Sequence, residues 1–168
     1  MIVVMKNLSF NGRDIISIKD FTREEIEHIL EVGTLIGYST IVMAKELGNN
    51  AEIITIEIDE GEVKYARKNI DEAEVKPTIK ILVGDALEII PTLCGTFDVV
   101  FLDAEKSEYF EYLTLVEPKI CIGSVIVADN TNSRTYSMRK YLNYVRNSGK
   151  YESKAVSWGS MEVSVKTA

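Results

Sequence analysis

The sequence predicts an α/β fold, a three-layer sandwich in which helices cover both faces of a mostly parallel sheet. From about residue 28 onward, apolar β-branched runs alternate with helix-like stretches. Near-continuous apolar strands separated by helices are typical of a parallel sheet that is buried on both faces. The last two strand-like runs differ, because only a turn at 159–160 separates them. Strands joined so closely pair antiparallel, so we expect the chain to end in a hairpin.

Each element follows from a local pattern. We expect strands at 29–32, 52–58, 78–83, 97–102 and 124–128, and hairpin strands at 151–158 and 161–166. We expect helices at 40–47, 61–73, 86–93, 109–116 and 135–147. In the second helix, for example, Val63, Ala66 and Ile70 recur at helical spacing. With 168 residues, of which 46% are hydrophobic, the chain is expected to form a single domain over 1–168.

Composition narrows the classes of partner and compartment. The formal net charge of −7 disfavours a broad nucleic-acid surface, although a structured RNA could still be reached through a local basic patch. Cys94 and Cys121 match no metal-ligand spacing, and we expect both to be reduced and partly buried in a cytoplasmic protein. No apolar run approaches the roughly 20 residues of a membrane-spanning helix.

Acidic residues follow the expected parallel strands, at the sheet edge where α/β proteins bind ligands. After the first strand, Gly33 and Gly37 would let the backbone approach a ligand, and the next helix N-terminus would favour an anionic group. Ser39 could cap that helix or bind a ligand carboxylate. Glu57 ends the second strand, where an acid is expected to accept hydrogen bonds from ribose hydroxyls. A tight turn without ligand explains the loop alone, but the loop and Glu57 together favour a bound adenosine group.

Taken together, these motifs resemble the metal-dependent, S-adenosylmethionine-dependent O-methyltransferases typified by catechol and caffeoyl-CoA O-methyltransferases. The stretches LEVGTLIGYST, TIEID, VGDALEIIPTL, FDVVFLDAEKSEY and VIVADN occur in the order of that family, over about 29–166. The resemblance implies a Rossmann-like class I methyltransferase fold with a mostly parallel seven-stranded sheet and a C-terminal antiparallel hairpin. It also implies a set of residues that bind S-adenosylmethionine: Glu31, Gly33, Gly37 and Ser39 at the methionine end, Glu57 at the ribose, Asp85 and Ala86 beside the adenine, and Asp103.

A metal site is expected where two further strands end. Asp103 and Asp129 follow strands that would be sheet neighbours, about 4.8 Å apart, and Asn130 adds a neutral oxygen. Two adjacent carboxylates without a partner are unfavourable, and a hard cation resolves the conflict. Either motif alone would be a strand-end acid or an Asx turn. The resemblance assigns Asp103, Asp129 and Asn130 as ligands of Mg²⁺ or another divalent cation.

Lys106, three residues beyond Asp103, is the candidate catalytic residue. A lysine there would ordinarily be a solvated surface residue. Near a divalent cation its pKa should fall, which would make it a general base, and the resemblance places the family's catalytic lysine at this position. The expected reaction is methyl transfer to a hydroxyl of a catechol-like small molecule or of a modified tRNA nucleoside.

The segment before the first strand departs from the family, whose members carry a longer helical segment there. Residues 1–28 instead weakly resemble the amino-terminal stretch of aspartate carbamoyltransferases, without their carbamoyl-phosphate loop, and we infer no carbamoyl transfer. Thr22 is expected to cap a helix, and Tyr38 and Trp158 are candidates for the acceptor site. Two alternatives stay open: a cofactor-binding domain that lacks a complete acceptor site and, disfavoured by the missing G-x-G-x-x-G spacing, an NAD-dependent oxidoreductase. A homodimer is compatible with the sequence.

Overall fold

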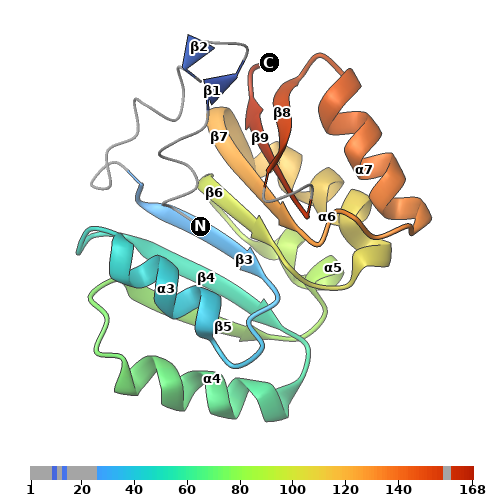
Figure 1. Cartoon of the computed structure of the whole chain (residues 1–168). Helices are drawn as coiled ribbons and strands as arrows, with labels where there is room; N and C mark the ends of the chain where they lie inside the picture. The colour runs from blue at the N-terminus through green and yellow to red at the C-terminus, as the bar shows by residue number, and fades with distance from the viewer. Residues whose placement is uncertain (1–8, 11–12, 15–25, 157–159) are drawn as a thin grey trace.

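A seven-stranded sheet forms the centre of the computed structural model, which describes residues 9–10, 13–14, 26–156 and 160–168. The strands are β3 (His28–Val32), β4 (Glu52–Glu57), β5 (Thr78–Val83), β6 (Phe97–Leu102), β7 (Ile120–Asp129), β8 (Tyr151–Val156) and β9 (Met161–Lys166), in the order β5-β4-β3-β6-β7-β9-β8. Strands β3 to β7 are parallel, and β9 runs antiparallel to both β7 and β8 (Figure 1). The mostly parallel sheet and the terminal hairpin are confirmed.

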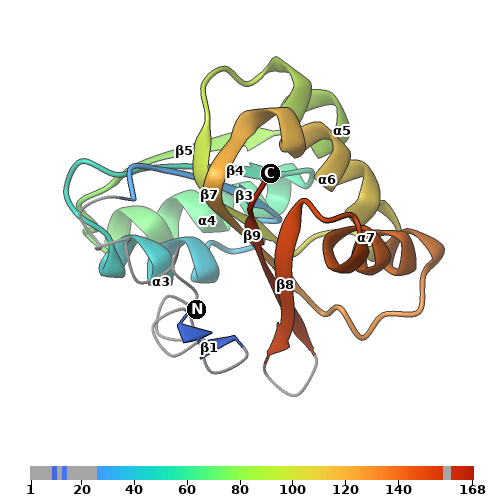
Figure 2. The same cartoon turned by 90° about the horizontal axis from the view of Figure 1, so that it is seen from above.

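Helices cover both faces of this sheet, as the sequence predicts. Helices α3 (Tyr38–Glu46) and α4 (Glu60–Glu72) lie on one face, and α5 (Ala86–Ile89), α6 (Tyr109–Val116) and α7 (Tyr136–Asn147) lie on the other (Figure 2). Three short 3₁₀ turns join them to strands: η1 (Ile90–Thr92), η2 (Lys106–Glu108) and η3 (Glu117–Lys119). Among the helices that the structure describes, none is long and apolar enough to cross a membrane.

Alternate residues of each central strand point into two separate cores. Leu30 and Val100 belong to the core that includes Tyr109 of α6, whereas their neighbours Ile29 and Val99 belong to the core that includes Met43 of α3. Because both faces are buried, the strands can be apolar throughout, and this explains the continuous apolar runs in the sequence.

Three expectations about local structure need correction. The helix expected at 86–93 is divided into α5 and η1, because Pro91 lies at the start of the 3₁₀ turn. Strand β7 begins at Ile120 instead of 124, and its pairing with β6 is irregular between Phe97 and Val99. Cys121 lies on this irregular part of β7, and Cys94 lies in the loop before β6. Both are exposed free thiols, so their predicted partial burial is wrong.

Part of the chain before the sheet is also described. Strands β1 (Ser9–Phe10) and β2 (Arg13–Asp14) form an antiparallel pair that the sequence did not indicate. The helix start expected at Thr22 and the acceptor-site candidate Trp158 lie outside the described residues.

Candidate functional site

A cavity of about 690 Å³ opens where β3, β4, β5 and β6 end. The chain adds β4 and β5 on one side of β3 and then returns to place β6 on the other side, so the strand order reverses at this point. Such a reversal leaves a crevice at the carboxyl ends of the strands, which is where open α/β sheets bind ligands. Of the predicted site residues, the cavity wall includes Gly33, Ser39, Glu57, Asp85, Ala86 and Asp103.

The glycine loop between β3 and α3 is shaped first by contacts within the protein. Gly33 has φ +100°, and a Cβ atom at this position would lie 2.2 Å from the carbonyl oxygen of Asp103. Gly37 has φ +83° and caps α3 without a side chain, while a Cβ atom there would lie 3.3 Å from Ile70. Only glycine combines a positive φ with the absence of a Cβ atom. The fold therefore explains both glycines even before a ligand is considered.

Glu31 lies beneath the loop and not in the cavity wall. Its side chain is fully buried and accepts hydrogen bonds from the hydroxyls of Ser39 (2.5 Å), Thr55 (2.6 Å) and Thr40. Burial raises the pKa of the Glu31 carboxyl, although these three hydrogen bonds oppose the rise. Ser39 therefore does not cap α3, because its hydroxyl donates to Glu31.

Glu57 occupies the position expected of a ribose-binding acid, at the end of β4 and in the cavity wall. One carboxylate oxygen accepts a hydrogen bond from the N–H of Leu35 (2.7 Å), and the other accepts one from the N–H of Asp59 (3.0 Å). Leu35 is itself in the left-handed region, with φ +48°. Glu57 thus holds the glycine loop in a strained conformation, and each of its oxygens retains a further lone pair for a ligand.

The cavity wall also includes a helix start and further acidic and aromatic side chains. Asp85 caps α5 by accepting a hydrogen bond from the N–H of Leu87 (2.8 Å). Glu108, also in the wall, accepts a hydrogen bond from the hydroxyl of Tyr112 at 2.5 Å. Sequence reasoning missed Glu108 and Tyr112, although their i, i+4 spacing after the β6 motif was an available signal.

Other wall residues were also missed or only partly anticipated. Leu35, Ile36, Tyr38 and Ile58 line the cavity and are exposed. Tyr38 is an acceptor-site candidate from the sequence; the other three gave no signal in the sequence beyond their position in the loops.

Asp103 joins this cavity to the expected metal site. Leu102 of β6 is paired with Ala128 of β7, so Asp103, which follows β6, and Asp129, the last residue of β7, come next on neighbouring parallel strands. The N–H of Asn130 donates to Oδ1 of Asp129 (2.7 Å), and Asn130 has φ +53°, in the left-handed region that asparagine tolerates. Asp129 and Asn130 lie outside the cavity wall, on its β7 side.

By the chemistry of their side-chain oxygens, these three residues are suitable ligands for a hard divalent cation. Within the described residues, no group of three His, Cys, Asp or Glu side chains is placed to hold a metal, and the predicted set consists of two carboxylates and one amide. Oxygen ligands of this kind, from the ends of adjacent strands, are the donors that Mg²⁺ prefers, with other positions left to water or substrate.

Lys106 is not a freely solvated surface lysine. Its ammonium nitrogen lies 3.0 Å from Oδ1 of Asp103, and only 25% of its side chain is exposed. The same nitrogen lies 5.8 Å from the ring centre of Tyr109. The structure therefore brings together the predicted base and a predicted metal ligand, although Lys106 itself is not part of the cavity wall.

Sequence comparison connects this arrangement to known proteins. A family model described as O-methyltransferase matches residues 22–139. The catechol O-methyltransferase of Niastella koreensis is 44% identical over 114 residues, which make up 63% of this chain and 50% of that protein. The catechol O-methyltransferase of Mycobacterium tuberculosis is 37% identical over 107 residues, or 63% of this chain and 49% of that protein. The chain spans about half the length of these curated relatives.

Solved structures of O-methyltransferases share the fold of this chain. The O-methyltransferase from Bacillus cereus in complex with SAH (S-adenosylhomocysteine) superposes with a TM-score of 0.76 at 26% identity, covering 84% of this chain and 74% of that chain. The O-methyltransferase TomG from Streptomyces achromogenes, in complex with SAM, superposes with a TM-score of 0.77 at 27% identity, covering 87% and 75%. The predicted Rossmann-like methyltransferase fold is confirmed.

Proposed function

This chain belongs to the O-methyltransferase family, and we propose that it transfers the methyl group of S-adenosylmethionine to a hydroxyl oxygen in a reaction that depends on a divalent metal ion. The observation that carries the proposal is the position of Asp103. This one residue lines the cavity, forms an ion pair with Lys106 and lies beside Asp129 on the neighbouring strand.

The residues of the cavity wall support binding of this cofactor. Bound there, S-adenosylmethionine would supply an electrophilic methyl group on a positively charged sulfur. Glu57 would accept hydrogen bonds from the ribose hydroxyls, and the loop containing Gly33 would lie against the methionine end. Carboxylates of Glu57, Asp85, Asp103, Glu105 and Glu108 line the wall, so the local charge favours a cationic ligand.

Lys106 is the proposed general base. A divalent ion held by Asp103, Asp129 and Asn130 would supply Lewis-acid chemistry that makes an acceptor hydroxyl more acidic. In its neutral form, Lys106 would take the hydroxyl proton on Nζ as the oxygen forms its bond to the methyl carbon and the carbon–sulfur bond breaks. Its contact with Asp103 holds Nζ beside one of the proposed metal ligands, which supports this role.

The composition of the cavity wall supports one class of acceptor over the other. Leu35, Ile36 and Tyr38 expose apolar surface there, and no Lys, Arg or His occurs among the described residues of the wall. This composition favours a small, planar, catechol-like acceptor over a modified tRNA nucleoside, whose phosphates would require basic partners. A cytoplasmic location, a homodimer and a single domain over 1–168 remain predictions.

The test is methyl transfer by the purified protein, with Mg²⁺, to a panel of catechols and to unmodified and modified tRNA. We expect turnover of catechols that a chelator abolishes and Mg²⁺ restores. Asp103→Asn should abolish this turnover but leave the cofactor affinity, measured by calorimetry, within a few fold of wild type. Turnover unaffected by chelator would contradict the metal assignment. Cofactor binding without turnover of any acceptor would favour the cofactor-binding domain, and preferential NAD binding would favour the oxidoreductase.

A further inference from the structure

Tyr109 is a fully buried tyrosine next to the proposed site, and the proposed reaction gives it no role. It is the first residue of α6, three residues after Lys106 and directly after η2. Its ring packs against Tyr112 and, edge to face, against Tyr141. A phenylalanine would satisfy these apolar contacts equally well, so the hydroxyl needs an explanation of its own.

The Tyr109 hydroxyl contacts the ends of two neighbouring strands, β6 and β7. It donates to the carbonyl oxygen of Leu102 at 3.0 Å and to the carbonyl oxygen of Asp129 at 2.9 Å. Leu102 ends β6 and immediately precedes Asp103, whereas Asp129 ends β7. One hydroxyl proton is therefore shared between the backbone groups that carry two of the three predicted metal ligands.

The ring of Tyr109 contacts Lys106, the proposed base. The ammonium group of Lys106 lies 5.8 Å from the centre of the Tyr109 ring, within the range of a cation–π interaction. Lys106 is thus held between Asp103 and the ring. Because Tyr109 touches both strand ends and Lys106, a small movement of α6 would change the separation of the groups on which the proposed reaction depends.

We propose that Tyr109 is a positioning residue, whose hydroxyl sets the separation of the β6 and β7 ends and so places Asp103 and Asp129 for a divalent metal ion. This inference rests on the proposed function, because it has no meaning if the site holds no metal. Groups that hold metal ligands in place by hydrogen bonds commonly change metal affinity by about 10–100-fold when they are removed. If Tyr109 contributed only to packing, removing its hydroxyl would not change the metal affinity selectively.

The variant Tyr109→Phe removes the hydroxyl and keeps the ring, its aromatic contacts and its contact with Lys106. The control Tyr151→Phe removes a hydroxyl that donates to Glu117 at 3.0 Å, at the start of β8 and away from the cavity. Each protein, saturated with S-adenosylhomocysteine, is titrated with Mn²⁺, and the free ion is followed by electron paramagnetic resonance. The affinity for S-adenosylhomocysteine and the free energy of unfolding are measured in parallel.

We expect Tyr109→Phe to weaken Mn²⁺ binding by about tenfold, with cofactor affinity within twofold of wild type, and Tyr151→Phe to leave both unchanged. Equal Mn²⁺ affinity in Tyr109→Phe and wild type would overturn the inference while leaving the proposed function intact. No Mn²⁺ binding by the wild-type protein would overturn both. A parallel loss of Mn²⁺ and cofactor affinity would indicate a structural role and would also overturn it.

A measurement on the wild-type protein covers the case in which Tyr109→Phe does not fold. If the hydroxyl contacts favour metal binding, metal binding must favour the hydroxyl contacts by the same factor. The Tyr109 hydroxyl proton, followed by NMR, should therefore exchange with water more slowly after Mg²⁺ is added to the complex with S-adenosylhomocysteine. An unchanged exchange rate would contradict the proposal.

Discussion

Asp103 makes three different contacts, and each fixes a different part of the site. Its N–H donates to the carbonyl oxygen of Val32 at 2.9 Å, which joins the ends of β6 and β3. Its own carbonyl oxygen fills the space that a side chain at Gly33 would need. Its carboxylate pairs with Lys106. At the scale of single residues, the cofactor loop, the proposed metal site and the proposed base therefore depend on one position.

Replacing Lys106 distinguishes a general base from a structural partner of Asp103. We expect Lys106→Met to lower kcat by about 10²–10⁴-fold, because the variant loses the amine proposed to take the acceptor proton, while cofactor affinity is retained. The loss should be smallest for phenolic acceptors that are acidic enough to ionise without a base. The measurement is kcat across acceptors of graded pKa, for wild type and variant.

The matched control for this prediction is Lys68→Met, on α4, where the lysine side chain is 71% exposed and pairs with Glu72 at 3.8 Å. We expect no change in kcat in this control. A small decrease that is uniform across the acceptor series of Lys106→Met would contradict the assignment of a base.

Glu57 is expected to act on the cofactor in two ways. Glu57→Ala removes the acceptor proposed for the ribose hydroxyls and also releases the N–H of Leu35, which it holds at 2.7 Å in a left-handed conformation. We expect the affinity for S-adenosylmethionine to fall by about 1–3 kcal/mol, as for the loss of hydrogen bonds to a charged group. Calorimetry provides the test, with the exposed Glu72→Ala as control. Unchanged affinity in a folded variant would remove Glu57 from the cofactor site.

At the scale of elements, local patterns predicted the helices and strands better than the contacts between them. The helix start expected at 135 is present as the cap of α7, where the Thr135 hydroxyl accepts a hydrogen bond from the N–H of Met138. The same hydroxyl also donates to the carbonyl oxygen of Lys106 at 2.8 Å. The sequence contains a signal for the cap, because capping is local, but none for a bond between residues so far apart in the chain.

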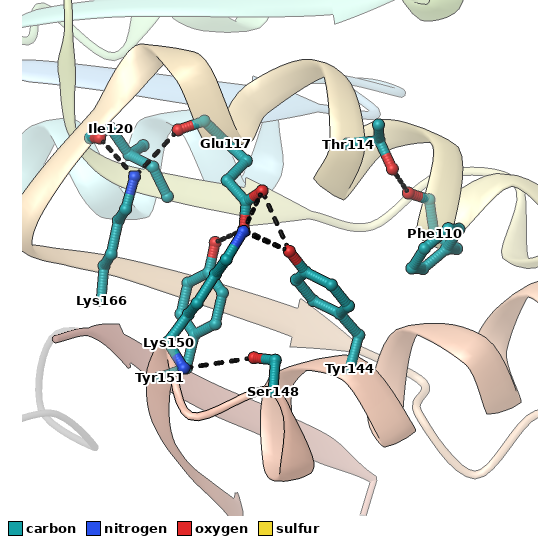
Figure 3. Close-up of polar contacts among 9 residues, drawn as sticks. All are labelled: Phe110, Thr114, Glu117, Ile120, Tyr144, Ser148, Lys150, Tyr151 and Lys166. Atoms are coloured by element: carbon teal, nitrogen blue, oxygen red, sulfur yellow. Dashed lines mark hydrogen bonds and ion pairs between the residues drawn. The ribbon is translucent and has the colours of Figure 1, made fainter. Parts of the chain in front are cut away.

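A second long-range arrangement joins α7 and β8 to the turn before β7. The Glu117 carboxylate accepts hydrogen bonds from the hydroxyls of Tyr144 and Tyr151, each at 3.0 Å, and pairs with the ammonium group of Lys150 at 3.1 Å (Figure 3). The ammonium group of Lys166 donates to the backbone carbonyl oxygen of the same glutamate at 3.1 Å. The cluster contains no cavity residue, so we assign it a role in stability.

The Glu117 cluster predicts a pH dependence of folding. Partial burial alone would raise the pKa of Glu117, but its hydrogen bonds to Lys150, Tyr144 and Tyr151 outweigh burial and lower the pKa below the ordinary value of 4.5. Below about pH 4.5 the unfolded chain therefore binds more protons at this residue than the folded chain does. The stability contributed by Glu117 is present at neutral pH and is lost as the pH falls through the lowered pKa.

We expect Glu117→Gln to lower the free energy of unfolding by about 1–2 kcal/mol at pH 7, because hydrogen bonds to a charged acceptor become hydrogen bonds to a neutral one. The difference in free energy of unfolding between Glu117→Gln and wild type should become smaller as the pH falls below about 4.5. Urea denaturation over a series of pH values provides the measurement, with the exposed Glu72→Gln as control. A difference that is constant over this pH range would show that the charge of Glu117 does not contribute.

At the scale of the whole molecule, most of the fold could be predicted because the sheet is buried on both faces. An apolar run such as 97–102 is then best interpreted as a buried strand. The ranges predicted at 78–83, 109–116 and 161–166 agree with the observed elements to the residue. The errors fall where tertiary contacts override local pattern. Cys121 is in an apolar run, yet it is exposed because β7 pairs irregularly with β6 there.

The candidate site was predictable to a similar degree, and for a related reason. Strand ends such as Glu57 and Asp103 could be identified because parallel strands bring their carboxyl ends to one edge. The position of Glu31 beneath the loop could not, because its partners Thr40 and Thr55 come from a helix and from another strand. Tyr109 gave no signal, since its carbonyl partners are defined only once β6 and β7 are adjacent.

A cofactor held between β3, β4, β5 and β6 should stabilise the molecule as a unit, because its site is built from the ends of four strands of a single sheet. At a ligand concentration of 100 times Kd, binding to the folded state alone adds about 2.7 kcal/mol to the free energy of unfolding. For a chain of this size, each kcal/mol raises Tm by about 2–4 °C, so S-adenosylmethionine should raise Tm by about 5–10 °C. NAD at the same concentration should leave Tm unchanged, and Glu57→Ala should require a higher concentration of S-adenosylmethionine for the same shift. Differential scanning calorimetry tests this, and a larger shift with NAD than with S-adenosylmethionine would contradict the cofactor assignment.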